Sequence, residues 1–126
     1  AWGWYDPGHG AIDICGYNIN GAEIHASAAG KVVFATNSGQ SSYGNYIMID
    51  HGYDSDWNDI VTLYAHCSYV SVTEGQYVNQ GDVIGYVGTT GNSTGPHLHF
   101  EYRINGIRYD PLNYITVPGN LIDVSG

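Results

Sequence analysis

The sequence predicts an all-β domain, a compact antiparallel β-sandwich or β-barrel. Apolar and polar residues alternate in segments 46–50 and 97–101, and this alternation is the period of a β-strand. Between Val70 and Gly88, short apolar runs are separated by glycine turns at small offsets. The chain also contains 18 glycines and 12 tyrosines, a composition that suits short strands joined by tight turns.

The first half of the chain begins with the aromatic, glycine-broken segment 2–7, which we expect to be irregular and able to line a groove. Ile12 and Ile14 then alternate with Asp13, which predicts a turn that runs into a strand. Further strands are expected at 32–35 after a glycine turn, at 46–50 and at 61–66.

The second half continues with a strand at 97–101 and a hairpin over 102–108, whose turn is Asn105-Gly106. The Asp110-Pro111 pair ends the last strand. We expect one domain over residues 1–126, with its core at about 9–115. Residues 1–8 would form a leading segment and residues 116–126 a tail.

Composition limits the classes of partner. Hydrophobic residues make up 43% of the chain and charged residues 12%, which favours a folded domain over a disordered segment. The formal net charge is −9, with Lys31, Arg103 and Arg108 as the cations, so neither nucleic acid nor an anionic membrane is an expected partner. No apolar stretch is long enough to span a bilayer, and the first residues do not show a basic region followed by an apolar region. We expect a mature or trimmed fragment of a longer protein.

The strand at 97–101 predicts a site. It places His97 and His99 on one face, with Leu98 and Phe100 in the core behind them. Two imidazoles on a buried strand face are costly unless they are hydrogen-bonded or bound to a metal. A pair of structural histidines is the alternative, but this spacing after a Gly-Pro turn favours a site.

Earlier segments supply further candidates. His9 and Asp13 form an HxxxD pattern of residue types that bind zinc, and His66 ends the strand at 61–66. A catalytic zinc site keeps three protein ligands and one open position for water. HxxxD and one histidine of the HLH pair complete such a set. The other histidine of the pair and a histidine from a neighbouring strand are then free for acid–base catalysis.

Two other functional readings of the sequence fail. The acidic loop 54–59 has Asp59 where an EF-hand needs glycine and Ala65 where it needs glutamate. A lipoyl- or biotinyl-carrier domain needs a modifiable lysine on an exposed turn, whereas the one lysine here is Lys31, in an Ala-Gly-Lys-Val-Val context. His25 and His51 have no partner pattern, and we expect them to be surface or hairpin residues.

The runs HGAID, LYAH and GPHLHFE resemble the lysostaphin-like (LytM-like) zinc endopeptidases, which cut bacterial peptidoglycan. The segments AAGKVVFA, YGNYIMIDHG, VTEGQYVNQGDVIGYVGTTGNSTG and DPLNYI are similar to that family's framework, in family order, from about His9 to Ile115. The resemblance implies a small antiparallel β-barrel or sandwich of the duplicated-hybrid-motif type, with a groove over one sheet. It also implies a zinc-dependent endopeptidase that hydrolyses a peptidoglycan cross-bridge or stem peptide with metal-activated water.

By this resemblance His9, Asp13 and His99 match the ligands of one Zn²⁺ per chain. His66 and His97 match the two catalytic histidines, one acting as the base and the other stabilising the oxyanion or protonating the leaving amine. Which of the two is the base stays open.

Other residues follow from the resemblance less directly. Asn45 matches a position that holds substrate in the groove, and Tyr5 is a candidate groove-wall aromatic that no motif anchors. Cys15 and Cys67 stand where small or apolar residues are more usual. A disulfide that braces the site in an oxidising exterior and two free buried thiols are the alternatives. The acidic loop 54–59 is longer than usual in the family.

The expected partner is a peptidoglycan peptide, and we expect a monomer in the extracellular space or the cell envelope. The alternative function, from another class, is a catalytically silent module of the same fold that binds wall or activates an amidase. Such relatives usually lack metal or catalytic residues, whereas His9, Asp13, His66, His97 and His99 are all present here. Wall remodelling, a role in sporulation and bacteriolysis stay open.

Overall fold

The computed structural model describes residues 2–5, 11–16, 19–91, 95–109 and 122–123. Within these residues every regular element is a β-strand and every strand pair is antiparallel, so the all-β prediction is confirmed. In the same residues no helix is long and apolar enough to cross a membrane. The strands are β1 (Trp2–Tyr5), β2 (Ala11–Gly16), β3 (Glu23–His25), β4 (Gly30–Thr36), β5 (Asn45–Tyr53), β6 (Asp59–Val70), β7 (Tyr77–Val78), β8 (Val83–Val87), β9 (Leu98–Ile104), β10 (Ile107–Tyr109) and β11 (Ile122–Asp123).

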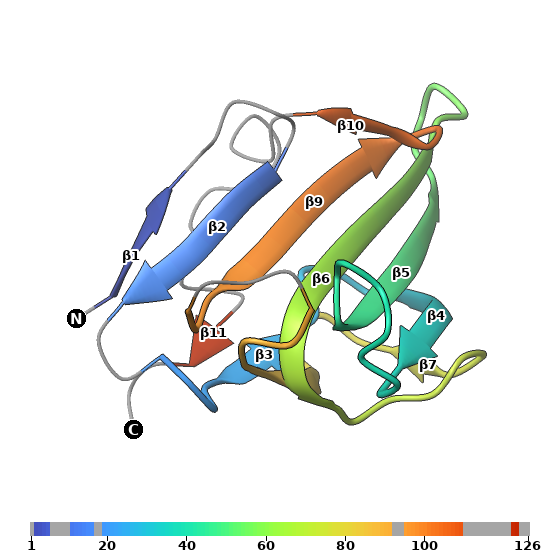
Figure 1. Ribbon diagram of the computed structural model, residues 1–126. Helices are drawn as coiled ribbons and strands as arrows, with labels where there is room; N and C mark the ends of the chain where they lie inside the picture. The colour runs from blue at the N-terminus through green and yellow to red at the C-terminus, as the bar shows by residue number, and fades with distance from the viewer. Residues whose placement is uncertain (1, 6–10, 17–18, 92–94, 110–121, 124–126) are drawn as a thin grey trace.

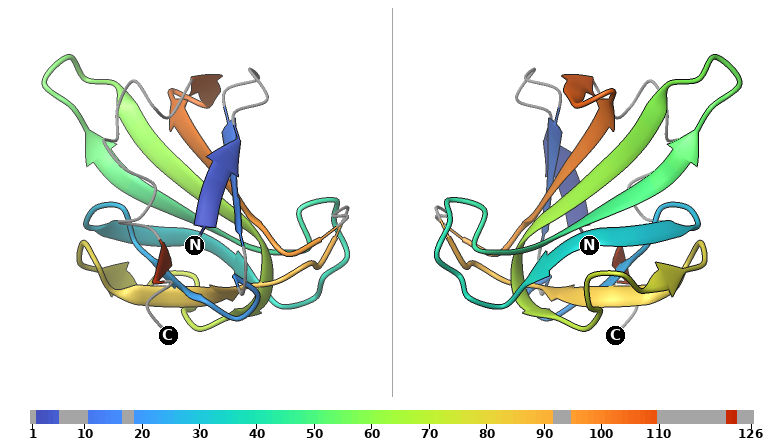
Figure 2. Two further views of the ribbon diagram at one scale, coloured as in Figure 1. Left: turned by 90° about the vertical axis from the view of Figure 1, so that its left-hand side faces the viewer. Right: turned by 90° about the vertical axis from the view of Figure 1, so that its right-hand side faces the viewer.

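The strands form one continuous sheet in the order β1-β2-β9-β6-β5-β4-β7 (Figure 1). β10 pairs with β9, and β8 connects β6 to β3, which also pairs with β11. The sheet curls on itself, so that β3, β4, β7 and β8 form a second layer beneath the long strands (Figure 2). This curl encloses the apolar core between the two layers.

Two segments outside the expected core are strands. We expected the leading segment to be irregular, but β1 pairs with β2 in the register Gly3↔Cys15 and Trp4↔Ile14. That expectation is wrong because the strand preference of the aromatic residues outweighs the glycine between them. In the expected tail, β11 pairs with β3.

The core consists of the inward faces of both layers. Leu98 and Phe100 of β9 are fully buried, as their alternation with histidine predicts. The ring of Phe100 meets that of Tyr64 edge-on at 5.3 Å between centroids. Burial of one such side chain contributes roughly 1.5–3 kcal/mol. The largest other buried side chains are Ile14, Ile19, Ile24, Ile47, Ile49, Leu63 and Ile84.

β6 is the central element of the fold. Its first half pairs with β9 on one side and with β5 on the other, and its second half pairs with β8 in the other layer. The register of the β6–β8 pair shifts between Cys67 and Tyr69, and that of the β5–β6 pair shifts between Asn45 and Ile47. At these shifts β6 passes from one layer to the other. The end of the β6–β9 ladder, at Ala65 and His99, therefore lies where the two layers meet.

Candidate active site

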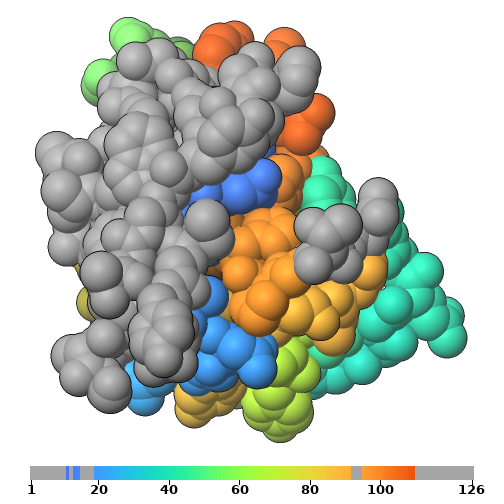
Figure 3. All heavy atoms as spheres, turned by 60° about the vertical axis from the view of Figure 1, so that its left-hand side comes forward, coloured from blue at the N-terminus to red at the C-terminus, as the bar shows by residue number. Residues whose placement is uncertain are grey.

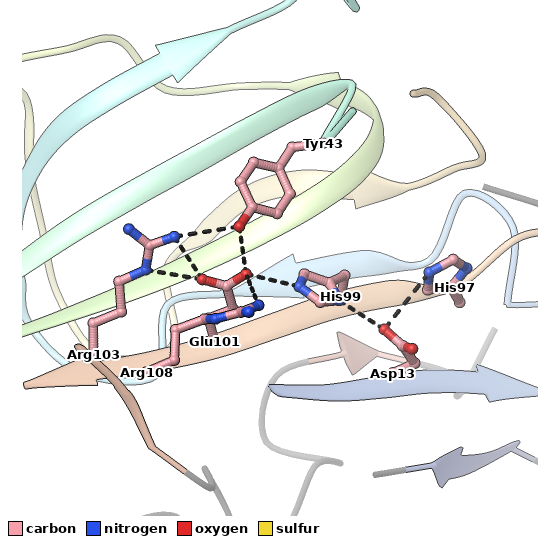
Figure 4. A network of polar contacts seen from close by, with 7 residues as sticks. All are labelled: Asp13, Tyr43, His97, His99, Glu101, Arg103 and Arg108. Carbon is pink, nitrogen blue, oxygen red and sulfur yellow. Dashed lines mark hydrogen bonds and ion pairs between the residues drawn. The ribbon is translucent and has the colours of Figure 1, made fainter. Parts of the chain in front are cut away.

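The register of β2 and β9 brings two predicted ligands together. Asp13 is directly opposite His99 in the ladder, so their side chains point to the same face. The Nδ1 of His99 lies 2.8 Å from the Oδ1 of Asp13. On the other side of His99 the partner in β6 is Ala65, whose small side chain leaves room beside the imidazole. Figure 4 shows the contact between Asp13 and His99 from close by.

His97 lies just before β9 and forms an isolated bridge with Gly88. Its Nδ1–H donates to the carbonyl oxygen of Gly95 at 2.9 Å, which fixes the orientation of the ring. Its Nε2 lies 3.7 Å from the Oδ1 of Asp13. The two histidines of the HLH pair therefore both face the carboxylate of Asp13, and their placement on one face is as the alternation predicts (Figure 4).

His66 reaches the same place through a backbone irregularity. Its φ is +65°, a value that non-glycine residues rarely adopt. Regular alternation would turn His66 into the core with Tyr64, whereas Cys67 would face the site with Ala65. Instead Tyr64 and Cys67 both pack in the core. The ring of His66 lies 4.8 Å from that of His97 and 5.8 Å from that of His99.

These side chains form what we call the histidine cluster, namely Asp13, His66, His97 and His99. Figure 3 shows the face on which the orange segment around residues 95–100 is exposed, between blue atoms of β2 and teal atoms of the segment before β5. The histidines of the cluster are largely but not completely buried. The arrangement can hold a cation, and it can move a proton at an imidazole nitrogen.

Electrostatics differ among the members of the cluster. Burial lowers the pKa of His66, and the charges of His97 and His99 lower it further, against the hydrogen bond to Thr90. Burial also acts to lower the pKa of His99, but hydrogen bonds to Asp13 and Glu101 outweigh it and raise the pKa to about 9. Burial acts to raise the pKa of Asp13, but the hydrogen bond from His99 and the histidine charges lower it. The ring of His66 therefore favours the neutral state, whereas the ring of His99 favours the positively charged state.

The donor chemistry of His99 tests whether a metal fits. Both ring nitrogens face carboxylates, Nδ1 at 2.8 Å from Asp13 and Nε2 at 2.9 Å from Glu101, so in this state the ring carries two protons. The proton on Nδ1 of His99 lies between this nitrogen and Oδ1 of Asp13. A metal cation would be attracted to the same position. Imidazole and carboxylate are also ligand types that zinc takes. Asp13 and His99 therefore fit a shared metal.

The predicted ligand set is only partly described. His9 lies outside the described residues, so the structure does not test its place beside Asp13 and His99. Within the described residues no group of three or more His, Cys, Asp or Glu side chains is arranged to hold a metal ion. The described residues include two of the three predicted ligands, Asp13 and His99.

Thr90 is a residue of the site that sequence reasoning missed. Its carbonyl oxygen accepts a hydrogen bond from the Nδ1–H of His66 at 2.7 Å, which leaves Nε2 of His66 as the unprotonated nitrogen. Its hydroxyl donates to the carbonyl of Cys67 at 2.6 Å and accepts from the backbone N–H of Asn45 at 3.0 Å. Thr90 thereby ties the loop after β8 to the strand that carries His66. A lone threonine in a Gly-Thr-Thr-Gly run gives no signal of this role.

Glu101 is a second residue beside the cluster to which the sequence analysis assigned no role. It is 0% exposed, and its carboxylate accepts from His99, Tyr43, Arg103 and Arg108 (Figure 4). Burial acts to raise its pKa, but the hydrogen bonds from His99, Tyr43 and Arg103 lower it to about 2. No motif signals this role, because the partners Tyr43 and Arg108 come from other segments of the chain.

The remaining predicted site residues have mixed outcomes. The amide of Asn45 is buried and donates to the carbonyls of Cys67 and Ser68, at 3.1 and 3.3 Å. Its role in holding substrate stays a prediction, and the side chain of Tyr5 lies outside the described residues. Cys67 is a free, buried cysteine, while the side chain of Cys15 is not described, so a disulfide between them is not observed.

The two histidines without a partner pattern lie away from the cluster. His25 in β3 is half-buried and faces Glu23, with 3.4 Å between Nε2 and Oε1. The Nδ1–H of His51 donates to the carbonyl of Ala29 at 2.8 Å, and its Nε2 lies 2.7 Å from the hydroxyl of Thr62. Both contacts are structural.

Comparison with known families and proteins gives a clear set of relatives. The model of peptidase family M23 matches residues 7–111 of the chain. The DD-carboxypeptidase/endopeptidase Mpg of Neisseria meningitidis serogroup B is 48% identical over 97 residues, which are 77% of this chain and 20% of that protein. The murein hydrolase activator NlpD of Salmonella dublin is 39% identical over 114 residues, which are 90% of this chain and 28% of that protein. The chain thus spans less than a third of the length of either relative.

Solved structures agree with these relatives. A zinc-containing peptidase from Vibrio cholerae superimposes with a TM-score of 0.72 at 31% identity, covering 87% of this chain and 31% of that chain. The catalytic domain of the antimicrobial peptidase lysostaphin from Staphylococcus simulans gives a TM-score of 0.69 at 32% identity, covering 90% of this chain and 86% of that chain. At these identities the likeness extends beyond the general fold.

Proposed function

The chain belongs to peptidase family M23, and from that premise we propose that it is a zinc-dependent endopeptidase that hydrolyses peptide bonds in bacterial peptidoglycan. The resemblance to lysostaphin-like peptidases is confirmed. The observation that carries the proposal is the Asp13–His99 pair on adjacent strands, flanked by the rings of His66 and His97. The relative Mpg is a DD-carboxypeptidase/endopeptidase and the Vibrio cholerae neighbour is a zinc-containing peptidase, which supports this reaction class and this metal.

In this proposal Asp13 and His99 hold one zinc ion together with His9. Carboxylate oxygen and imidazole nitrogen suit zinc, and the 2.8 Å approach of Oδ1 to Nδ1 supports a shared ligand role. Zinc in such a site supplies Lewis acidity, which polarises a carbonyl and acidifies a water molecule. The net charge of −9 adds a field that favours binding of a divalent cation.

His66 and His97 are the proposed catalytic histidines. The Nδ1 of each ring is committed to a carbonyl oxygen, that of Thr90 or that of Gly95, so each presents Nε2 for chemistry. The lowered pKa of His66 keeps this ring neutral near pH 7, and a neutral ring can accept a proton from water. We therefore assign the base to His66. His97, beside Asp13, is left to stabilise the oxyanion or to protonate the leaving amine.

A second candidate function is that of a catalytically silent module that activates another wall enzyme, since the relative NlpD is a murein hydrolase activator. The NlpD match extends over 90% of this chain, so family membership alone does not separate the two functions. The complete set of His9, Asp13, His66, His97 and His99 favours the enzyme. Because peptidoglycan lies in the cell envelope, we propose that the protein acts there or outside the cell.

One experiment separates the two candidates. Purified peptidoglycan is incubated with the zinc-loaded protein alone, with a wall amidase alone, and with both, and new amino groups are counted. The endopeptidase releases amino groups without the amidase, and sequencing of the released ends then identifies the cleaved bond. No release by the protein alone, together with more release from the mixture than from the amidase alone, would contradict the enzyme and support the activator.

A further inference from the structure

Glu101 is a buried carboxylate to which the proposed chemistry assigns no task. It is fully buried in β9, two residues after His99, and on the same face of that strand. Burial of an ionised carboxylate costs several kcal/mol unless it is paired and hydrogen-bonded. Glu101 has such partners, and the fact that they gather beside a proposed metal ligand calls for an explanation.

The protein commits much of its positive charge to this carboxylate. The whole chain has three Lys and Arg residues, and two of them, Arg103 and Arg108, contact Glu101. These two arginines are directly opposite each other in the β9–β10 ladder, where like charges destabilise a strand pair. The carboxylate of Glu101 compensates both of them. The arrangement is therefore organised around Glu101.

The two carboxylate oxygens of Glu101 have different partners. Oε1 accepts from both Nε and Nη2 of Arg103, at 2.8 and 2.7 Å. Oε2 accepts from the hydroxyl of Tyr43 at 2.6 Å, from Nη1 of Arg108 at 3.2 Å and from Nε2 of His99 at 2.9 Å. The oxygen that faces His99 is thus held by three strand or loop segments (Figure 4).

We propose that Glu101 is a positioning residue, which accepts the Nε2 proton of His99 and thereby directs Nδ1 of that ring towards the metal shared with Asp13. Arg103, Arg108 and Tyr43 hold the carboxylate in place for this purpose. A histidine that binds a metal through one nitrogen commonly donates its other N–H to a carboxylate, which fixes the tautomer and makes the ligand more basic. The inference rests on the proposed function, because that function makes His99 a ligand.

The first test measures zinc affinity by competition with a chelator in Glu101→Gln, which keeps the shape of the side chain and removes its charge. We expect zinc affinity to fall about 10- to 100-fold, as for other partners of metal ligands. The matched control is Glu23→Gln, because Glu23 also contacts a histidine, His25, but far from the cluster. Its zinc affinity should equal that of the wild type. Equal affinity in Glu101→Gln and the wild type would overturn the inference.

The second measurement needs no variant and remains decisive if Glu101→Gln fails to fold. Nitrogen-15 NMR of the zinc-loaded wild type reports which nitrogen of His99 carries the proton. We expect the proton on Nε2, slow to exchange with solvent, and the metal on Nδ1. A proton on Nδ1 with the metal on Nε2 would overturn the inference while leaving the proposed function intact. A wild type that binds no zinc would overturn both.

Discussion

His66 packs its ring against that of His97, with 4.8 Å between the centroids, because the backbone of His66 has a φ of +65°. Without this conformation the alternation of β6 would place the imidazole in the core beside Tyr64. The meeting of the two proposed catalytic histidines therefore depends on one unusual backbone angle. It also explains why Cys67 is buried in the core and not beside the site.

The positive φ of His66 predicts that a glycine variant at this position is more stable than an alanine variant. Alanine in this conformation is strained whereas glycine is not, so His66→Gly should be more stable to urea than His66→Ala by about 1 kcal/mol. In a regular strand the order is the reverse, since glycine there costs about 0.5–1 kcal/mol relative to alanine. Equal or greater stability of His66→Ala would show that the positive φ is not present in solution.

Removal of either proposed catalytic histidine should abolish turnover and spare the metal. His66→Ala and His97→Ala should each lower kcat by at least about 100-fold, the usual contribution of a general acid or base. Their zinc content should stay at the wild-type level, because neither residue belongs to the proposed ligand set. The measurement is release of amino groups from peptidoglycan alongside metal analysis. Intact cleavage in either variant would show that the assigned role is wrong.

The contact between the Tyr43 loop and the Thr90 loop should be sensitive to a single methyl group. Gly44 has a φ of +67°, and a Cβ there would meet backbone atoms of Thr90. Gly44→Ala should lose about 1–3 kcal/mol of unfolding free energy from overpacking, in addition to about 1 kcal/mol from backbone strain. Because Thr90 holds His66, kcat should fall as well.

The matched control for that substitution is Gly75→Ala. Gly75 has a φ of +93°, but a Cβ there would meet nothing within 4 Å. It should therefore show the strain alone, with kcat unchanged. Equal losses of stability and activity in the two variants would contradict the role of the loop contact.

The sequence could predict those parts of the site that depend on neighbouring residues, but not those that depend on contacts between distant segments. The strand that carries His97, His99 and the two buried apolar residues follows from local alternation, and so does the strand of Asp13. The place of His66 does not, because it depends on a backbone angle that no side-chain pattern encodes. Nor does the role of Glu101, since its partners Tyr43 and Arg108 are brought to it by tertiary contacts and by the register of a hairpin.

An acidic pair away from the site gives a prediction for pH. The hydrogen bond with Asp50, together with slight burial and the charge of Asp50, raises the pKa of Asp59 to about 6, from 3.8. Because the folded state holds this proton more tightly, its contribution to stability is full below pH 4 and is lost as pH rises through 6. Asp59→Asn keeps a hydrogen-bonding group without the charge. As pH rises from 4 to 7, the free energy of unfolding of Asp59→Asn should therefore increase relative to that of the wild type.

The control for this experiment is Asp56→Asn, which removes one negative charge from the exposed loop of the same hairpin. Urea unfolding of the two variants and the wild type at pH 4 and pH 7 isolates the contribution of Asp59, because all titrating groups except Asp56 and Asp59 are common to the three proteins. A stability difference between Asp59→Asn and the wild type that does not change with pH would contradict the shared proton.

The measurement that tests the central claim most directly combines zinc content with cleavage of peptidoglycan, in the wild type and in His99→Ala. We predict one zinc ion per wild-type chain and release of new amino groups, with both lost in His99→Ala. A wild type that neither binds zinc nor cleaves any wall, or a His99→Ala variant that retains zinc and cleavage, would contradict a metal centre built on Asp13 and His99.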